Sequence, residues 1–133
     1  MCRLAGNYDV RVAYKLLEWP VANGVDVLLE GSGGTVGRRN SKGEAYFAGA
    51  DSIGSDALTT DLAGSLRLVR NRRSVQEYYR HDGRWVALSR SDATSGETDV
   101  RLAVRAAGAD FSHEEVQVAF DDFRVSRGRL SCS

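Results

Sequence analysis

Apolar and polar residues alternate in two runs within the last third of the chain. The apolar rows are Val100, Leu102, Val104 and Ala106 in the first run and Val116, Val118 and Phe120 in the second. A period of two places successive side chains on opposite faces of a strand, so each run predicts a strand with one buried face. The second run changes phase at Asp121-Asp122, because Phe123 and Val125 fall on the other parity. A β-bulge at the aspartates would return both rows to one core.

Alternation also predicts strands in the N-terminal half. Over residues 9–17 apolar side chains fall on one face, and Trp19-Pro20 ends this strand because proline cannot donate to a ladder. Shorter strands are predicted over residues 25–30, 35–39 and 45–48. The glycine-rich stretch 31–37 lacks the Lys-Ser/Thr ending of a phosphate-binding loop, so we interpret it as a hairpin turn. Residues 49–64 are small and polar, and they predict an excursion with one weak strand or one turn of helix.

The strongest hairpin signal joins residues 65–70 to residues 75–80 through a short polar connection. Pairing Arg70 with Val75 places Glu77 on the core face of the sheet. A three-residue loop would instead place Glu77 on the surface. We favour the first register, because the second aligns core leucines with polar residues.

The favoured register predicts a carboxylate inside the protein. Glu77 then lies opposite Leu68, and Arg70, on the same face near the strand end, is its expected partner. In the other register Glu77 would pair with Arg67 at the surface. A buried, unpaired carboxylate either destabilises the fold or becomes protonated, so Glu77 needs a partner, a water or a bulge.

The remaining stretches complete an all-β pattern. Residues 81–83 predict a turn, residues 85–88 a strand and residues 91–98 a polar loop. Residues 112–115 fit a helix-capping box, but the alternation that follows them favours a strand. About nine strands, without a helix long enough for a parallel crossover, predict an antiparallel sandwich or barrel. We expect a single domain over residues 1–133.

Composition narrows the choice of partners. Eighteen basic and eighteen acidic residues cancel, so neither a nucleic acid nor an anionic membrane is the expected partner. Within these basic residues, the pairs Arg38-Arg39 and Arg72-Arg73 are expected to be solvated. No apolar stretch approaches the roughly 20 residues of a membrane helix, and the first residues lack the apolar core of a signal peptide. An exported or extracellular context stays open.

The two cysteines lie at the extreme ends of the chain, at Cys2 and Cys132. A bridge between them would close nearly the whole chain and stabilise the fold by roughly 4–5 kcal/mol in the loop-entropy model. Two free thiols in a reducing compartment are an equal expectation.

Several motifs resemble the concanavalin A-like lectin/glucanase superfamily, and in particular bacterial laminin-G-like domains of unassigned function. The motifs are Leu66-Arg67-Leu68-Val69-Arg70, residues 75–79, Asp82-Gly83-Arg84-Trp85, residues 118–125, residues 7–12 and Trp19-Pro20. The resemblance covers nearly the whole chain and implies a jelly roll of two curved antiparallel sheets. Its members range from sugar-binding modules to glycan hydrolases and adhesion domains. This chain departs from the pattern at Glu77, where related domains usually carry a small residue.

Hydrolase chemistry has little support. Retaining glycosidases need two carboxyl groups about 5 Å apart, and the family's Glu-x-Asp-x-(x)-Glu pattern is missing from the sequence. No Gly-x-Ser-x-Gly elbow accompanies His81 or His113, and two histidines with two terminal cysteines lack zinc-ligand spacing. We therefore expect no catalytic activity and no cofactor. Calcium is the one metal left open, with Asp51, Asp56 and Asp61, or Asp121 and Asp122, as candidate ligands.

Sugar binding needs an exposed aromatic platform flanked by planar polar groups. In the favoured register Tyr78 faces outward with Gln76, Arg67 and Arg80. The sequence therefore favours a non-catalytic carbohydrate-binding module that uses a concave sheet around Tyr78. The alternative is a structural or protein-interaction domain that uses the same surface for assembly, and a glycan hydrolase is the least favoured.

Overall fold

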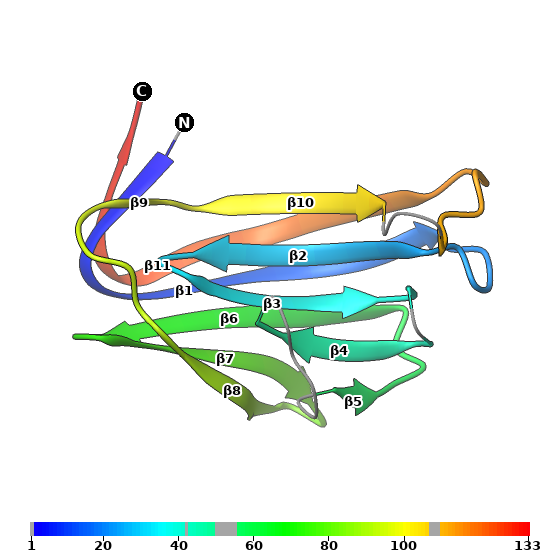
Figure 1. Ribbon diagram of the computed structural model, residues 1–133, viewed down its shortest axis with the longest axis horizontal. Coiled ribbons are helices and arrows are strands. Elements are labelled where there is room, and N and C mark those ends of the chain that lie inside the picture. The colour runs from blue at the N-terminus through cyan, green and yellow to red at the C-terminus, as the bar shows by residue number, and fades with distance from the viewer. Residues whose placement is uncertain (1, 42, 50–55, 107–109) are drawn as a thin grey trace.

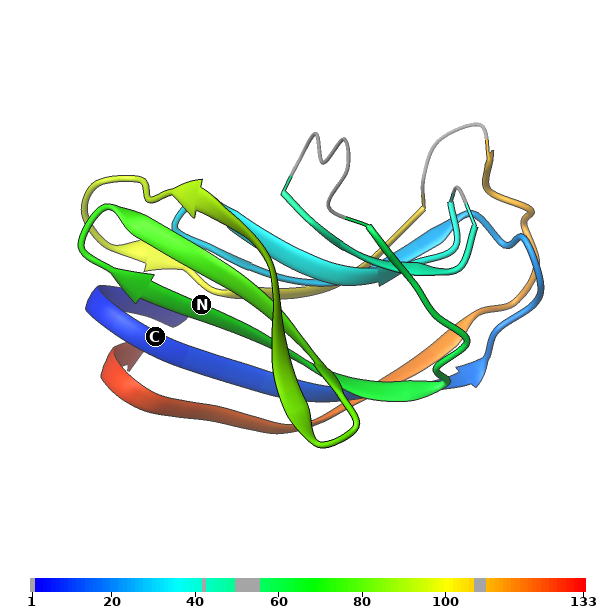
Figure 2. The ribbon, with the colours of Figure 1, turned by 90° about the horizontal axis from the view of Figure 1, so that it is seen from below.

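A computed structural model describes residues 2–41, 43–49, 56–106 and 110–133. These residues form two antiparallel sheets that pack face to face, so the predicted all-β, two-sheet sandwich is confirmed. Figure 1 shows the strands of both sheets, and Figure 2, seen from below, shows the two layers. In the described part of the chain, no helix is long and apolar enough to cross a membrane.

The first sheet, called sheet I, contains the longest strands. Its order is β11-β1-β6-β7-β8, and a short strand β9 also pairs with β1. The bounds are β1 Cys2–Glu18, β6 Ala63–Asn71, β7 Ser74–His81, β8 Arg84–Asp92, β9 Thr98–Asp99 and β11 Gln117–Cys132. Because β1 and β11 pair along nearly their whole length, the two chain ends lie side by side in Figure 1.

The second sheet, called sheet II, has the order β10-β2-β3-β4-β5. The bounds are β2 Val25–Gly31, β3 Gly34–Arg39, β4 Ala45–Ala48, β5 Ala57–Leu58 and β10 Arg101–Ala106. The core lies between the sheets and combines alternating side chains of both. Its buried members include Val10, Val12, Leu66, Leu68, Val27, Leu29 and Val36. In β1, β6 and β7 buried residues alternate with more exposed ones, which confirms the period-two interpretation there, whereas β2 and β4 bury both rows.

The predicted hairpin register is confirmed, since Arg70 pairs with Val75 and Leu68 with Glu77. Asn71 pairs with Ser74, so Arg72 and Arg73 alone form the turn and are both exposed. Strand boundaries were predicted less well. β1 begins at Cys2 instead of residue 9, because register breaks between Ala5 and Asp9 interrupt the alternation. β8 continues to Asp92, into the stretch that was predicted to be a loop.

The bulge predicted in the C-terminal strand is present. Ala13 pairs with Asp121 and Arg11 with Arg124, which leaves one extra residue on β11, and Asp122 adopts a φ of 52°. Beyond the bulge Val125 packs on the core, as predicted. Phe123 contradicts the prediction, because it is 39% exposed at the bulge itself.

The structure also answers two expectations about an edge strand and the chain ends. Val104 was placed in a buried row, but it is 48% exposed because β10 is the edge strand of sheet II. Cys2 and Cys132, left open by the sequence, form a disulfide across β1 and β11.

Candidate functional site

The outer face of sheet I carries the residues predicted to bind a ligand. Tyr78, Gln76 and Arg80 alternate with core residues along β7, so they share this face, and Arg67 lies opposite Tyr78 on β6. The Tyr78 hydroxyl donates to Gln76 Oε1 at 2.9 Å. The structure thus brings all four predicted residues together.

Arg67 is the central cation of this face. Its Nε donates to Asp9 Oδ1 at 2.8 Å, and a second bond joins its NH2 group to Asp9 Oδ2. The guanidinium lies 5.5 Å from the ring centre of Tyr78 and 5.3 Å from that of Trp85, within cation–π range of both. Hydrogen bonding from Arg67 holds the pKa of the Asp9 carboxyl below its usual value. Arg67 therefore joins two aromatic rings and one carboxylate into a fixed unit.

Trp85 and Arg11 belong to the same surface, although the sequence analysis missed both. Arg80 pairs with Trp85 across the β7–β8 hairpin, and the Arg11 and Arg80 guanidiniums lie 5.9 Å and 5.4 Å from the Trp85 ring centre. The sequence could have predicted the place of Trp85, because the turn at Asp82-Gly83 fixes the pairing of Trp85 with Arg80. Arg11 had no such signal, because it lies three strands away and reaches Trp85 through the twist of the sheet.

A shallow hollow of about 130 Å³ opens beside Trp85. It is lined by Arg11, Val12, Ala13, Ser65, Arg80, Trp85, Asp122 and Arg124. Arg124 Nε donates to Asp122 Oδ1 at 2.7 Å, so the charges of these two residues neutralise each other. Arg67 is offset in the same way by Asp9. Arg11 and Arg80 form no ion pair in the described part of the chain, so the hollow carries excess positive charge.

Glu77 lies between the sheets, as predicted, and is fully buried. The predicted partner is wrong. Arg70 instead donates to Ser32 Oγ at 3.3 Å and to the backbone oxygens of Arg72 and Gly96, and the Ser91 hydroxyl binds Glu77 Oε1. The reason is geometric, because Arg70 extends past the end of the hairpin toward the loops.

Two buried oxygens near each other have no hydrogen-bond partner among the described residues. They are Oε2 of Glu77 and the hydroxyl of Tyr8. Burial raises the pKa of Glu77, and the side chains of Ser91 and Ser89 and the backbone of Thr35 counter this only in part. Burial also raises the pKa of Tyr8. This group, called the Glu77 cluster, favours a neutral acid.

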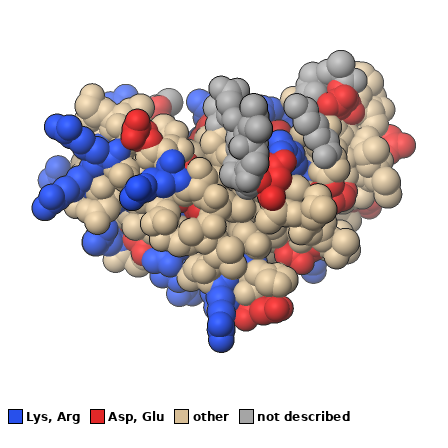
Figure 3. Space-filling model, turned by 60° about the horizontal axis from the view of Figure 1, so that its bottom comes forward, with Lys and Arg blue, Asp and Glu red and all other residues tan. Residues whose placement is uncertain are grey.

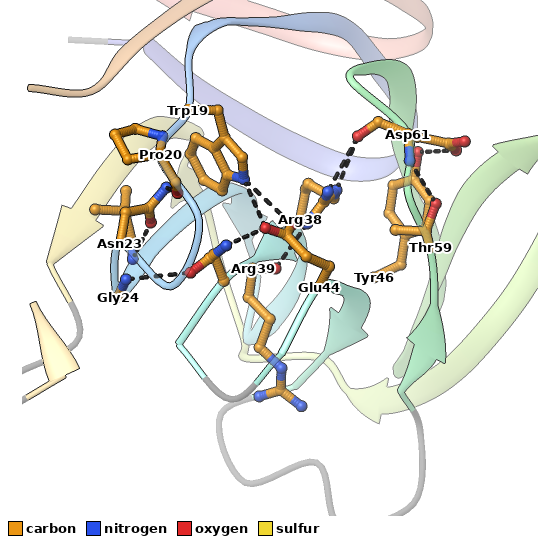
Figure 4. Close-up of polar contacts among 12 residues, drawn as sticks. Trp19, Pro20, Asn23, Gly24, Arg38, Arg39, Glu44, Tyr46, Thr59 and Asp61 are labelled. Atoms are coloured by element: carbon orange, nitrogen blue, oxygen red, sulfur yellow. Dashed lines mark hydrogen bonds and ion pairs between the residues drawn. The ribbon is translucent and has the colours of Figure 1, made fainter. Parts of the chain in front are cut away.

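A second buried polar group, called the Arg38 cluster, lies at the other end of β3 (Figure 4). Arg38 was expected to be solvated but is only 1% exposed. It forms an ion pair with Glu44, and its Nε and NH2 donate to the Asp61 backbone oxygen at 3.2 and 3.1 Å. The Trp19 indole also donates to the Glu44 carboxylate, at 3.1 and 3.2 Å. Every charge in this cluster has a direct partner.

Two tyrosines extend the Arg38 cluster into the core. The Tyr46 hydroxyl donates to Asp61 Oδ2 at 2.7 Å, so the Tyr14 hydroxyl, 2.6 Å from that of Tyr46, must donate to it. Burial raises the pKa of Tyr14 to about 12 and that of Tyr46 further. Both phenols therefore keep their protons at physiological pH.

The structure describes four of the five candidate calcium ligands. Asp51 lies outside the described residues, Asp56 forms an ion pair with Arg39, and Asp61 is held by Tyr46. Asp121 and Asp122 lie in the bulge. Among the residues that the structure describes, no group of three or more acidic, histidine or cysteine side chains is placed to hold a metal ion.

Comparisons with known proteins bear on the fold alone. No protein-family model matches the sequence, and no curated protein matches it. One similar solved structure is described as "The crystal structure of a functionally unknown protein from Saccharomyces cerevisiae", with a TM-score of 0.54 and 9% sequence identity. The alignment covers 93% of this chain and 71% of that one. At this identity the likeness supports the two-sheet fold and says nothing of activity.

Proposed function

We propose that this chain is a non-catalytic carbohydrate-binding domain, and that the outer face of sheet I binds acidic glycans. The observation that carries the proposal is the arrangement around Trp85, where three guanidiniums lie within 6 Å of one ring centre. The resemblance to concanavalin A-like domains, with their jelly-roll topology, supports a glycan-binding role.

The surface chemistry fits sugars that carry carboxylate or sulfate groups. Guanidinium groups bind such anions through paired N–H donors. Arg11 and Arg80 form no ion pair in the described part of the chain, although Arg11 donates to Ser126 Oγ at 3.5 Å and acts electrostatically on Asp9, and Arg80 donates to the Gly83 backbone oxygen at 3.3 Å. Trp85 and Tyr78 supply the apolar surface that a sugar ring needs. Because the Arg67 guanidinium lies within cation–π range of both rings, a sugar that packs there meets a positive charge, from which an acidic sugar gains and a neutral sugar does not.

The absence of a catalytic pair around the hollow supports a binding role. Retaining hydrolysis needs two carboxyl groups about 5 Å apart. Among the described residues that line the hollow, Asp122 supplies the sole carboxylate, and Arg124 binds it. The proposal therefore assigns no bond-breaking step to this face.

Titration calorimetry tests the proposal with polygalacturonate and dextran sulfate as acidic polymers and dextran as the neutral control. We expect binding of the acidic polymers that weakens as salt rises, because the contacts are ionic. Trp85→Ala and Arg80→Gln should each weaken binding by about tenfold. Arg73→Gln removes the same charge at the opposite end of β7 and should change little.

Three results would count against the proposal. Equal affinity for dextran and dextran sulfate would remove the role of charge, and equal losses in Arg73→Gln and Arg80→Gln would remove the role of the hollow. No binding of any glycan, together with a stable dimer by light scattering, would favour the alternative of an assembly surface.

A further inference from the structure

A larger pocket, of about 590 Å³, lies away from the outer face of sheet I. It is lined by Glu44, Leu58, Thr59, Thr60, Asp61, Tyr79 and His81. These residues come from β5 and the segment after it, from β7, and from Glu44 in the β3–β4 connection, so the pocket opens at the edge of the sandwich. Figure 3 shows this side of the molecule, with an uncharged middle and with Lys and Arg gathered toward the end that bears the β6–β7 turn.

Tyr79 gives the pocket an aromatic wall. It follows Tyr78 in the chain but points to the opposite face of sheet I. One face of its ring stacks on the buried Tyr46, with ring centres 4.3 Å apart and planes 19° apart. Tyr79 is partly buried through this contact with the core, and it also lines the pocket. Leu58, which is 88% exposed, adds apolar surface.

Asp61 gives the pocket a fixed hydrogen-bond acceptor. Its Oδ2 accepts from Tyr46, its backbone oxygen accepts from Arg38, and its backbone N–H donates to Thr59 Oγ1 at 3.0 Å. Oδ1 has no donor among the described residues. The carboxylate is thus held in place by the Arg38 cluster, with one oxygen left for a ligand. Figure 4 shows Asp61 and Thr59 at the margin of that cluster.

The charge of this pocket is opposite to that of the outer face of sheet I. Arg38 and Glu44 offset each other inside the cluster, so Asp61 leaves the pocket with net negative charge. An anion would be repelled, whereas hydroxyl groups would find the Asp61 oxygen and the hydroxyls of Thr59 and Thr60 as partners. A ligand with one apolar face and a rim of hydroxyls matches the aromatic wall and these acceptors together.

We propose that this edge pocket is a separate binding site for an uncharged sugar ring, which packs on Tyr79 and donates a hydroxyl to Asp61. The inference stands on its own residues and does not rest on the proposed function of the outer face. The two sites have opposite charge preferences, so each can fail without the other.

Saturation-transfer NMR on the full chain tests this site, with the methyl glycosides of glucose, galactose, mannose and N-acetylglucosamine as probes and methyl glucuronide as the charged control. We expect saturation transfer to at least one neutral glycoside, and any transfer to the glucuronide, which the outer face of sheet I would bind, should fall in the Trp85→Ala variant. Asp61→Asn keeps the shape of the side chain and should weaken binding by about tenfold, since the charged acceptor is lost. Tyr79→Phe keeps the ring and should retain binding.

Trp85→Ala is the matched control, because it damages the outer face and leaves the pocket intact. It should not change transfer to the neutral glycoside. Thr60→Ala, at an exposed position, gives a second pocket variant should Asp61→Asn fail to fold, and it should also weaken binding. The inference is overturned if no neutral glycoside receives saturation, if the glucuronide binds to Trp85→Ala as well as the neutral glycoside does, or if Trp85→Ala removes the neutral signal while the folded pocket variants retain it.

Discussion

The Arg38 cluster and the Glu77 cluster are both buried between the sheets, at opposite ends of β3, yet they solve the problem of buried charge differently. Around Arg38, the guanidinium nitrogens bond to the backbone oxygens of Asp61 and Arg39 and to the Glu44 carboxylate. Around Glu77, one carboxyl oxygen and the nearby Tyr8 hydroxyl lack partners within the described residues. The first cluster can keep its charges, whereas the second favours a proton on its acid.

The two clusters differ in whether the buried charge has a partner of opposite charge. Arg38 and Glu44 neutralise each other and backbone oxygens accept from Arg38, so each of its guanidinium nitrogens has a partner. Glu77 meets only hydroxyls and backbone, none of which carries a positive charge. Gly34 allows β3 to pack closely on β7 beside Glu77, because a Cβ at position 34 would lie 2.5 Å from Val75 Cγ1 and 3.4 Å from Glu77 Oε1. The two ends of the sandwich should therefore respond oppositely to removal of charge.

The largest expected effect is at Arg38. Arg38→Met fills a similar volume but leaves Glu44 without its cationic partner and two backbone oxygens without their donor, so we expect a loss of about 3–5 kcal/mol in the free energy of unfolding. Urea denaturation followed by circular dichroism measures it. Arg3→Met, at the exposed ion pair with Asp99, is the control and should cost about 1 kcal/mol or less. Similar losses in both variants would show that burial of the Arg38 cluster does not matter.

A smaller loss is expected from Gly64→Ala, which tests the tyrosine pair of the Arg38 cluster. A Cβ at position 64 would lie 2.5 Å from the Tyr46 hydroxyl and 2.9 Å from the Tyr14 hydroxyl. We expect the crowding to cost about 1–3 kcal/mol, measured by thermal unfolding. In a Tyr46→Phe background, where the closest atom is gone, the same substitution should cost less. Strict additivity of the two changes would contradict this contact.

The sequence predicted Glu77 better than Arg38, for a physical reason. The hairpin pairing fixes the face of every residue in β6 and β7, so an inward carboxylate followed from register alone. The same rule placed Tyr78 and Gln76 outward. Arg38 also has core parity in β3, but an arginine is rarely buried, and the partners that make burial tolerable come from loops whose position no periodicity encodes.

The hydrogen-bond and ring partners of a side chain were therefore harder to predict than the sheet face on which it lies. Arg70 shares the correct face with Glu77, yet its long side chain bonds to Ser32 and Gly96 instead, which depends on loops that converge only in the fold. Arg11 is similar, because sheet twist brings it to Trp85 across two intervening strands. Pairing register determines which side of a sheet a residue occupies, and tertiary packing determines what it meets there.

The smallest effect, and the one of opposite sign, is expected at Glu77. Burial raises the pKa of Glu77 in the folded state, so its favourable contribution is complete below the unfolded-state pKa and is lost as pH rises through the folded pKa. Glu77→Gln stays neutral at every pH, so the free energy of unfolding of the variant should rise relative to that of the wild type between acidic and neutral pH. Unfolding in urea at both pH values gives this difference, and Asp9, whose pKa is lowered, cancels because it is unchanged in both proteins. A constant difference across that range would mean that Glu77 titrates normally, and that its cluster handles charge as well as the cluster around Arg38.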